Sequence, residues 1–200
     1  MQNRPGFIIP FKLEGKRIIL RPLRLSDVPA IVRICNDREV MKYLGGEFKY
    51  PTNAAEERKF IRRTWKKRDG VEPGIALKET GEIIGGVVLK GLGDENAYKV
   101  GEIGYWLGRK YWNRGYAVEA VSLMLDYAFR QLKLRKVFAR VYQPNILSVK
   151  LLKKLGFKKE AVLKEHVKSR FTRDWFDVEY YSTVNEKINR KLSLFKYGSD

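Results

Sequence analysis

Residues Val100–Leu132, with the sequence VGEIGYWLGRKYWNRGYAVEAVSLMLDYAFRQL, set the organisation of this 200-residue chain. The first part, Val100–Leu107, is short, apolar and rich in β-branched and aromatic residues, which predicts a buried strand. The last part predicts a long amphipathic helix, because its apolar residues recur at helical spacing. These residues are Val118, Val121, Leu125, Ala128 and Leu132. A basic loop that contains glycine joins the strand to the helix.

The loop Arg109–Ala117 has the features of an anion-binding site. The first amides of a helix have no partner within the helix, and the helix dipole adds positive potential there. Gly115 and Ala117, spaced as G-x-A, allow a ligand to approach the backbone closely. Phosphate is the anion that these features favour. From the loop alone, a plain strand-to-helix turn with glycines at 108 and 115 stays open as the alternative.

Motifs and composition exclude several classes of protein. Neither GxxxxGKS/T nor a GxGxxG after a strand is present, which removes the main support for a nucleoside triphosphate or dinucleotide site. One cysteine, Cys35, excludes internal disulfides and fits a reducing cytoplasm. One histidine and one cysteine cannot build the usual zinc or iron site, so we expect no metal. The N-terminal MQNRPGFIIP lacks a secretory pattern, and no apolar run reaches membrane-spanning length.

The chain is strongly basic. It has 41 Lys and Arg against 23 Asp and Glu, a net charge of +18. This charge indicates an acidic partner, such as nucleic acid, a ribonucleoprotein surface, an acidic substrate or a polyphosphate cofactor. A charged surface adapted to high temperature is the alternative, and both causes stay open. Hydrophobic content of 44% is ample for a core.

The remaining elements predict one mixed α/β domain over residues 1–186, followed by a basic tail at 187–200. Besides Val100–Leu107, strands are predicted at Lys16–Arg21, Ile75–Lys78, Ile83–Leu89, Lys136–Tyr142 and Phe157–Leu163, with a final hairpin of Glu165–Ser169 and Trp175–Ser182. Besides the long helix, helices are predicted at Asp27–Asn36 after an N-cap at Ser26, at Arg38–Leu44, from a cap at Thr52 or Asn53 to Lys67, and at Ile146–Leu155.

This order of elements resembles the GNAT superfamily of N-acetyltransferases, and most closely its RimJ and RimL branch, which acetylates the N-termini of ribosomal proteins. The resemblance covers about residues 12–185 and depends on the order and spacing of several short motifs. They are Leu20-Arg21-Pro22-Leu23, Gly81–Gly86, Gly104–Leu107, Tyr111–Ala120, Asn145 with Ser148, Lys154-Leu155-Gly156-Phe157, and Glu165-His166 with Asp177 and Tyr181.

The resemblance implies a fold, an activity and a cosubstrate. The fold is α/β, of the α+β kind, with a mixed sheet of about seven strands splayed between the fourth and fifth, flanked by about four helices. The activity is transfer of an acetyl group from acetyl-CoA to a primary amine, by direct attack in a ternary complex. The implied acceptor is the N-terminal amine of a protein, most closely a ribosomal protein.

The resemblance also implies residues for coenzyme A. The family loop Q/R-x-x-G-x-G/A falls on residues 112–117, with Trp112 in place of Gln or Arg. The implied diphosphate site consists of the backbone amides of Asn113, Arg114, Gly115, Tyr116 and Ala117. Tyr105 and Leu107 match the strand positions that pair with the pantetheine arm, and Asn145 matches the residue that bonds this arm from the other side. A helix N-cap is the competing role for Asn145. Lys154, beside Lys150 and Lys153, is the candidate for the 3′-phosphate, against an ordinary solvated face.

Three residues are candidates for catalysis. Glu165 is slightly preferred as the base that takes the proton of the amine, with Glu102 next. The alternative for Glu165 is a solvated residue of the hairpin, and the alternative for Glu102 is an ion pair at a strand edge. The superfamily tyrosine seven residues after the motif asparagine is replaced by Leu152, and Ser148 is the implied substitute beside the leaving thiolate. A packed or surface role is favoured for the lone His166.

Two rival functions remain at this stage. One is acetylation of a small amine, such as a polyamine or an antibiotic, against which the basic charge argues. The other is a non-catalytic RNA- or ribosome-associated binding protein, although the four tryptophans fit core packing better than an RNA-binding motif. The acceptor and the oligomeric state, a homodimer included, are left open by the sequence. The expected location is the cytoplasm, without membrane attachment.

Overall fold

The computed structural model of the chain describes residues 11–45, 48–92 and 99–185. The predicted tail at 187–200 and the N-terminal MQNRPGFIIP lie outside these residues. Among the described residues, no helix combines the length and the apolar character that a membrane span requires.

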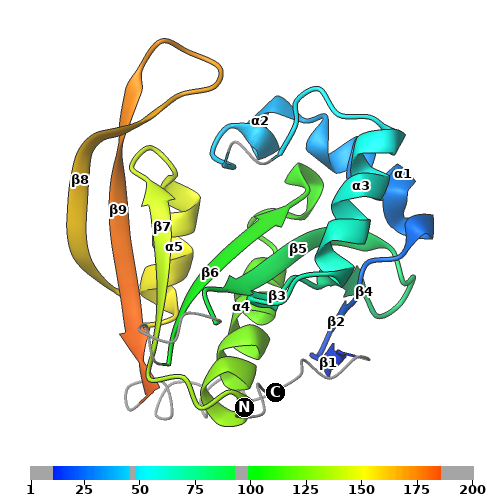
Figure 1. Ribbon diagram of the computed structural model, residues 1–200, viewed down its shortest axis with the longest axis horizontal. Coiled ribbons are helices and arrows are strands. Elements are labelled where there is room, and N and C mark those ends of the chain that lie inside the picture. The colour runs from blue at the N-terminus through cyan, green and yellow to red at the C-terminus, as the bar shows by residue number, and fades with distance from the viewer. Residues whose placement is uncertain (1–10, 46–47, 93–98, 186–200) are drawn as a thin grey trace.

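One twisted sheet passes through the described part of the molecule (Figure 1). Its strands lie in the order β1-β2-β4-β5-β6-β7-β9-β8, with β3 paired to β5. The predicted mixed sheet is confirmed, and two strands of only two residues each, β1 and β3, extend the expected set. The strands are β1 (Leu13–Glu14), β2 (Ile18–Arg21), β3 (Gly70–Val71), β4 (Gly74–Leu77), β5 (Ile83–Lys90), β6 (Val100–Leu107), β7 (Lys136–Tyr142), β8 (Lys158–Lys168) and β9 (Trp175–Val184).

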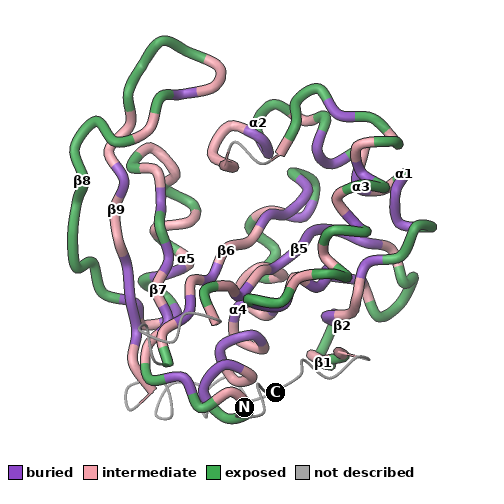
Figure 2. The backbone as a smooth tube through the Cα atoms, in the orientation of Figure 1, coloured by how far each residue is buried: buried purple, intermediate pink, exposed green. Residues whose placement is uncertain are grey.

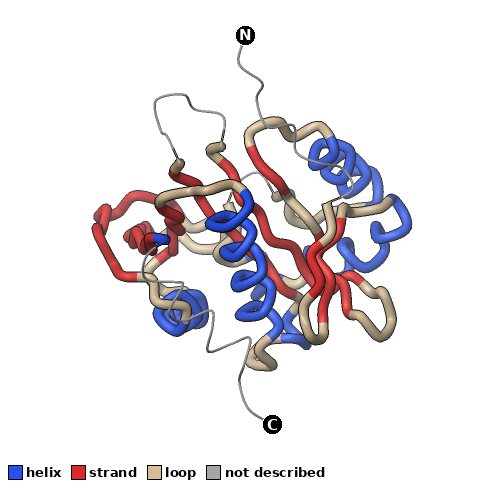
Figure 3. Tube along the Cα trace, turned by 90° about the horizontal axis from the view of Figure 1, so that it is seen from below, coloured by secondary structure: helices blue, strands red, loops and turns tan. Residues whose placement is uncertain are grey.

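Helices cover both faces of the sheet (Figure 3). Buried residues of α4 and α5 belong to one core cluster, whereas those of α1, α2 and α3 belong to a second. Successive side chains of β6 alternate between the clusters: Ile103 and Leu107 join the first, and Trp106 joins the second. The helices are α1 (Val28–Cys35), α2 (Arg38–Met41), α3 (Ala54–Trp65), α4 (Tyr116–Asp126) and α5 (Ile146–Lys154).

The sheet opens between β6 and β7, the only parallel pair among the described strands. They pair only over residues 100–102 and 136–138. Beyond that point β6 keeps its antiparallel partner β5, and β7 keeps β9, so the two halves of the sheet diverge (Figure 1). The predicted splay between these two strands is confirmed. It leaves the edge of β6 that faces β7 without a strand partner from Ile103 onward.

The predicted break between Phe157–Leu163 and Glu165–Ser169 was wrong, since β8 is one strand with a bulge. Its register against β9 shifts between Leu163 and Val167. Glu165 lies inside this bulge with a φ of 46°, and its N–H donates to Oδ1 of Asp177 at 2.9 Å. The extra residues of the bulge interrupt the alternation of side chains along β8, so in the sequence they resemble the end of one strand and the start of another. Figure 2 shows that β8 is exposed, whereas β9 is buried toward its end.

Three helix boundaries also differ from the prediction, and one of them belongs to the helix predicted at Arg38–Leu44, which ends at Met41. Ser26 is not the N-cap of α1, because residues Leu25–Asp27 form a 3₁₀ turn and α1 begins at Val28. The carboxylate of Asp27 accepts the N–H of Arg24 at 2.7 Å and pairs with the guanidinium of Arg21. The long helix predicted to Leu132 is α-helical only to Asp126 and continues as a π-helical turn to Gln131.

Candidate active site

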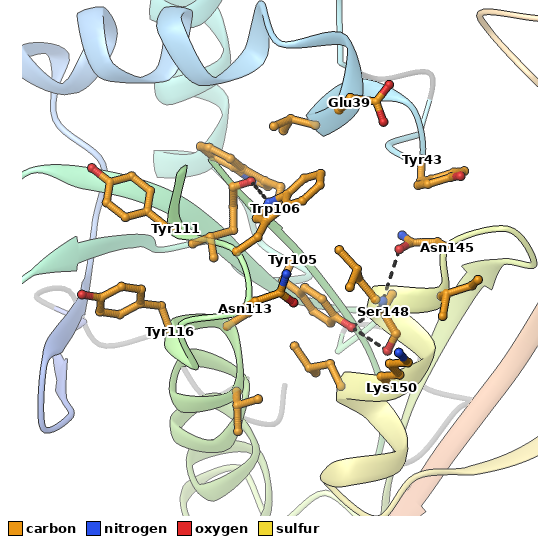
Figure 4. A pocket seen from close by; sticks show the side chains of 18 of the residues that line it. Glu39, Tyr43, Tyr105, Trp106, Tyr111, Asn113, Tyr116, Asn145, Ser148 and Lys150 are labelled. Atoms are coloured by element: carbon orange, nitrogen blue, oxygen red, sulfur yellow. Dashed lines mark hydrogen bonds between the residues drawn. The ribbon is translucent and has the colours of Figure 1, made fainter. Parts of the chain in front are cut away.

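A cavity of about 500 Å³ lies where the sheet opens, between the free end of β6, the first turn of α5, the N-terminus of α4 and the short helix α2 (Figure 4). Most of the residues that the sequence singled out for a cofactor or for catalysis border it. These are Tyr105, Leu107, Trp112, Asn113, Gly115, Tyr116, Ala117, Asn145, Ser148 and Lys154. Segments separated by more than forty residues in sequence therefore meet around one space.

The loop before α4 presents backbone groups to this cavity. Gly115 is the N-cap residue of α4 and has a φ of 79°, a left-handed conformation that favours glycine. The first amides of a helix have no partner within it, and no side chain among the described residues caps α4 in their place. Trp112 anchors the loop, because its indole N–H donates to the carbonyl of Leu107 at 2.7 Å. The result is a fixed positive helix end that faces the cavity.

Two hydroxyl groups meet on the opposite wall. The Tyr105 hydroxyl lies 2.6 Å from Oγ of Ser148, and either atom can donate (Figure 4). Burial raises the pKa of Tyr105, although the hydrogen bond with Ser148 opposes this shift. Tyr105 is therefore a neutral hydrogen-bond donor at ordinary pH. The sequence pointed to the backbone of Tyr105 and not to its hydroxyl, because Tyr105 alternates with core residues and its partner lies 43 positions away.

Asn145 has the N-cap geometry that competes with cofactor binding. Its Oδ1 accepts the N–H of Ser148 at 3.2 Å, and the residue also borders the cavity. This bond fixes the first turn of α5 and with it the backbone of Ser148. Of the three lysines on α5, Lys150 and Lys154 border the cavity, whereas Lys153 does not.

The remaining sequence candidates lie outside the residues that border the cavity. Arg114 belongs to the loop but turns its carbonyl to Arg17, at 2.9 Å from Nη1. Leu152 is completely buried in the core, and His166 is exposed in the β8 bulge. Position 152 therefore supplies no tyrosine hydroxyl. The tyrosine hydroxyl that lies beside Ser148 belongs to Tyr105 of β6.

The two carboxylates proposed as bases have different surroundings. Glu102 forms a bidentate pair with Arg140, at 2.9 and 3.1 Å, and lies 3.8 Å from Nζ of Lys90. Glu165 is exposed at the bulge of β8. Neither borders the cavity. The carboxylate that does so among the described residues is Glu39 of α2, which sequence patterns did not single out (Figure 4).

A splayed mixed sheet with an uncapped helix N-terminus at its opening is the arrangement that the resemblance to GNAT N-acetyltransferases implies, and comparison with known proteins agrees. The sequence matches the family described as Acetyltransferase (GNAT) domain over residues 17–158. The chain belongs to this family. It is 34% identical over 159 residues to the uncharacterized N-acetyltransferase p20 of Bacillus licheniformis, which covers 79% of this chain and 88% of that protein.

Solved structures show the same fold. Mycobacterium smegmatis RimJ in complex with CoA-disulfide superposes with a TM-score of 0.82 at 21% identity, over 95% of this chain and 96% of that chain. RimL, a ribosomal L7/L12 alpha-N-protein acetyltransferase in complex with coenzyme A, superposes with a TM-score of 0.76 at 19% identity, over 87% and 98%. At these identities the likeness shows the fold alone.

Proposed function

We propose that this chain acetylates the N-terminal amine of a protein, with ribosomal proteins as the acceptor class and the cytoplasm as the place of action. The observation that carries the proposal is one cavity that joins an uncapped helix N-terminus to a half-buried pair of hydroxyls. The names of RimJ and RimL, two proteins of the same fold, support the choice of acceptor. The amine enters from the side of α2, where Glu39 and Tyr43 border the cavity.

Acetyl-CoA occupies the cavity along its length in this proposal. The amides of residues 113–117 hold the diphosphate, because a helix N-terminus stabilises negative charge. The pantetheine arm lies along the unpaired edge of β6 at Tyr105–Leu107 and bonds as an added strand does. Asn145 contacts this arm from α5, and Lys154 holds the 3′-phosphate.

The chemical step is direct attack by the neutral amine on the thioester carbonyl. A base first takes a proton from the ammonium through water. The C–N bond then forms as the C–S bond breaks, the attacking nitrogen releases its second proton to water, and the thiolate of coenzyme A receives a proton. The Tyr105 and Ser148 hydroxyls supply that proton or a hydrogen bond in its place, since the raised pKa of Tyr105 means that its hydroxyl is still protonated when the thiolate forms. A backbone amide of Tyr105 or Ile103 on the free edge of β6 stabilises the carbonyl oxygen.

Acetyl transfer to peptides tests this function. Purified protein is incubated with acetyl-CoA and peptides that carry the N-terminal sequences of ribosomal proteins, and mass spectrometry locates the acetyl group. Acetylation of the α-amine is expected. The same peptides with a blocked N-terminus and a free lysine control for the site, and a polyamine controls for small acceptors. Transfer to the polyamine alone would contradict the proposed acceptor.

Glu165 is the base in this proposal, as the family resemblance implies, and it acts on the amine through water because it does not border the cavity. Glu165→Gln is expected to lower kcat/KM for the peptide about tenfold at pH 7, where about a tenth of an N-terminal amine is neutral. At pH 9 most of the amine is neutral, so the loss is expected to disappear. Initial rates across this pH range check the result.

Glu102→Gln is the matched control, since Arg140 and Lys90 already engage this carboxylate. It is expected to show no loss that depends on pH. If the loss at pH 7 appears in Glu102→Gln and not in Glu165→Gln, the base is Glu102. If neither protein shows it, no carboxylate of this pair acts as base.

A further inference from the structure

Arg17, just before β2, contacts the loop at residues 113–117 and the first turn of α4 through three different groups. Its Nη1 donates to the carbonyl of Arg114 at 2.9 Å, and its Nε donates to Oε2 of Glu119 at 3.1 Å. Its backbone N–H donates to Oε1 of the same carboxylate at 2.8 Å. The guanidinium also lies over the ring of Tyr116, 4.4 Å from the centroid. One residue just before the start of β2 therefore connects the loop to the first turn of α4.

The bond to Arg114 fixes the orientation of a peptide group that belongs to the site. A trans peptide is planar, and its C=O and N–H point in opposite directions. When Arg17 holds the carbonyl of Arg114, the N–H of Gly115 is held on the side away from Arg17. Gly115 borders the cavity, whereas Arg17 and Arg114 do not. The contact thus orients an amide of the proposed diphosphate site from behind.

The bond to Glu119 reduces the repulsion between this carboxylate and a phosphate at the N-terminus of α4. Glu119 lies in the first turn of α4, where a carboxylate stabilises the helix but repels a bound phosphate. Its side chain is only 16% exposed, so water screens it poorly. The guanidinium of Arg17 neutralises this charge and donates to Oε2 through Nε, while the backbone N–H of Arg17 donates to Oε1. The helix N-terminus can then attract an anion despite its acidic residue.

We propose that Arg17 is a positioning residue for acetyl-CoA: it sets the loop in its phosphate-binding form and cancels the charge of Glu119. The inference rests on the proposed coenzyme A site. It predicts an effect on the diphosphate end of the ligand and none on the thioester chemistry. The free energy of unfolding is measured alongside, because replacement of Arg17 also leaves the poorly screened carboxylate of Glu119 without this ion pair.

Calorimetric titration with coenzyme A measures the effect directly. Arg17→Met is expected to raise Kd about tenfold, and Arg17→Lys less, because lysine keeps the charge but not the planar fork. The matched control is Arg130→Met, since Arg130 pairs with Asp126 at 2.9 Å at the other end of the same helix run. That protein should bind as the wild type does. The double replacement Arg17→Met with Glu119→Gln is expected to recover part of the lost affinity.

Turnover with S-acetylpantetheine, which lacks the diphosphate, separates positioning from general damage. Arg17→Met should raise KM for acetyl-CoA at unchanged kcat and leave kcat/KM for S-acetylpantetheine at the wild-type value. An equal loss with both donors overturns the inference, as does a Kd for coenzyme A within twofold of wild type. If the wild-type protein itself fails to bind coenzyme A, the proposed function fails first and the inference fails with it.

Discussion

Tyr105→Phe is expected to turn over about a hundredfold more slowly than the wild type, the scale on which general-acid assistance is lost. Phe keeps the ring on β6 but removes the hydroxyl that lies 2.6 Å from Oγ of Ser148. The thiolate of coenzyme A then leaves without its donor. Burial raises the pKa of Tyr105, so the wild-type rate should show no loss from ionisation of this group at moderately alkaline pH. Single-turnover rates with saturating acetyl-CoA check the chemical step itself.

Tyr111→Phe is the matched control for this experiment. Tyr111 borders the same cavity, but its hydroxyl donates to Oε2 of Glu82 at 3.2 Å and points away from Ser148 (Figure 4). Its loss is expected to leave kcat unchanged. Ser148→Ala should reproduce part of the Tyr105→Phe defect, and the double replacement should cost less than the sum, because the two hydroxyls act together. A wild-type single-turnover rate in Tyr105→Phe would exclude the hydroxyl from the chemical step.

Gly115→Val is expected to weaken coenzyme A binding about a hundredfold, as measured by calorimetry. The φ of 79° at Gly115 places an L-residue in a strained region, and branching at Cβ adds to the cost. A Cβ there would also lie 3.1 Å from Nη2 of Arg17. The loop is expected to relieve this strain by rotating its peptide groups, so that the amides no longer face one anion.

Gly81→Val separates the loss of binding from the loss of stability. Gly81 has a φ of 72° in the turn between β4 and β5, and a Cβ there meets no atom within 4 Å. Both replacements should therefore lower the free energy of unfolding by a similar amount, about 1–2 kcal/mol. Only Gly115→Val should lose coenzyme A. Equal Kd values for the two proteins would contradict a diphosphate site at residues 113–117.

Local patterns explain why much of the fold could be predicted. The alternation of apolar side chains predicted β7, and a continuous apolar run predicted β6, because the pattern of a strand is visible within a few residues. The bulge of β8 was missed, since the bond from Glu165 to Asp177 joins residues twelve positions apart across a hairpin. The short strands β1 and β3 carry too few residues for any period to appear.

In the candidate site, too, features that are contiguous in sequence could be predicted, whereas contacts between distant residues could not. The loop at residues 113–117 could be predicted because its glycine, its helix and its strand are contiguous in sequence. The contacts of Arg17 with Arg114 and Glu119 span 97 and 102 positions, and nothing in the local sequence pairs them. Likewise, the sequence leaves Glu102 as either a base or an ion-pair partner, and only the fold identifies Arg140 as the residue that it pairs with. Residue types were available from the sequence, but their partners were not.

The divergence of β6 and β7 also bears on how the protein avoids aggregation. An open strand edge is a template for another chain, and natural sheets protect the edges at their rim. The rim strand β8 carries that protection in Lys158, Lys159, Lys164 and Lys168. The open edge of β6 carries none, because it is recessed in the middle of the sheet beside α5 rather than at its border. Among the described strands, the unpaired edge of β6 is thus protected by the fold around it, whereas the edge of β8 is protected by surface charge.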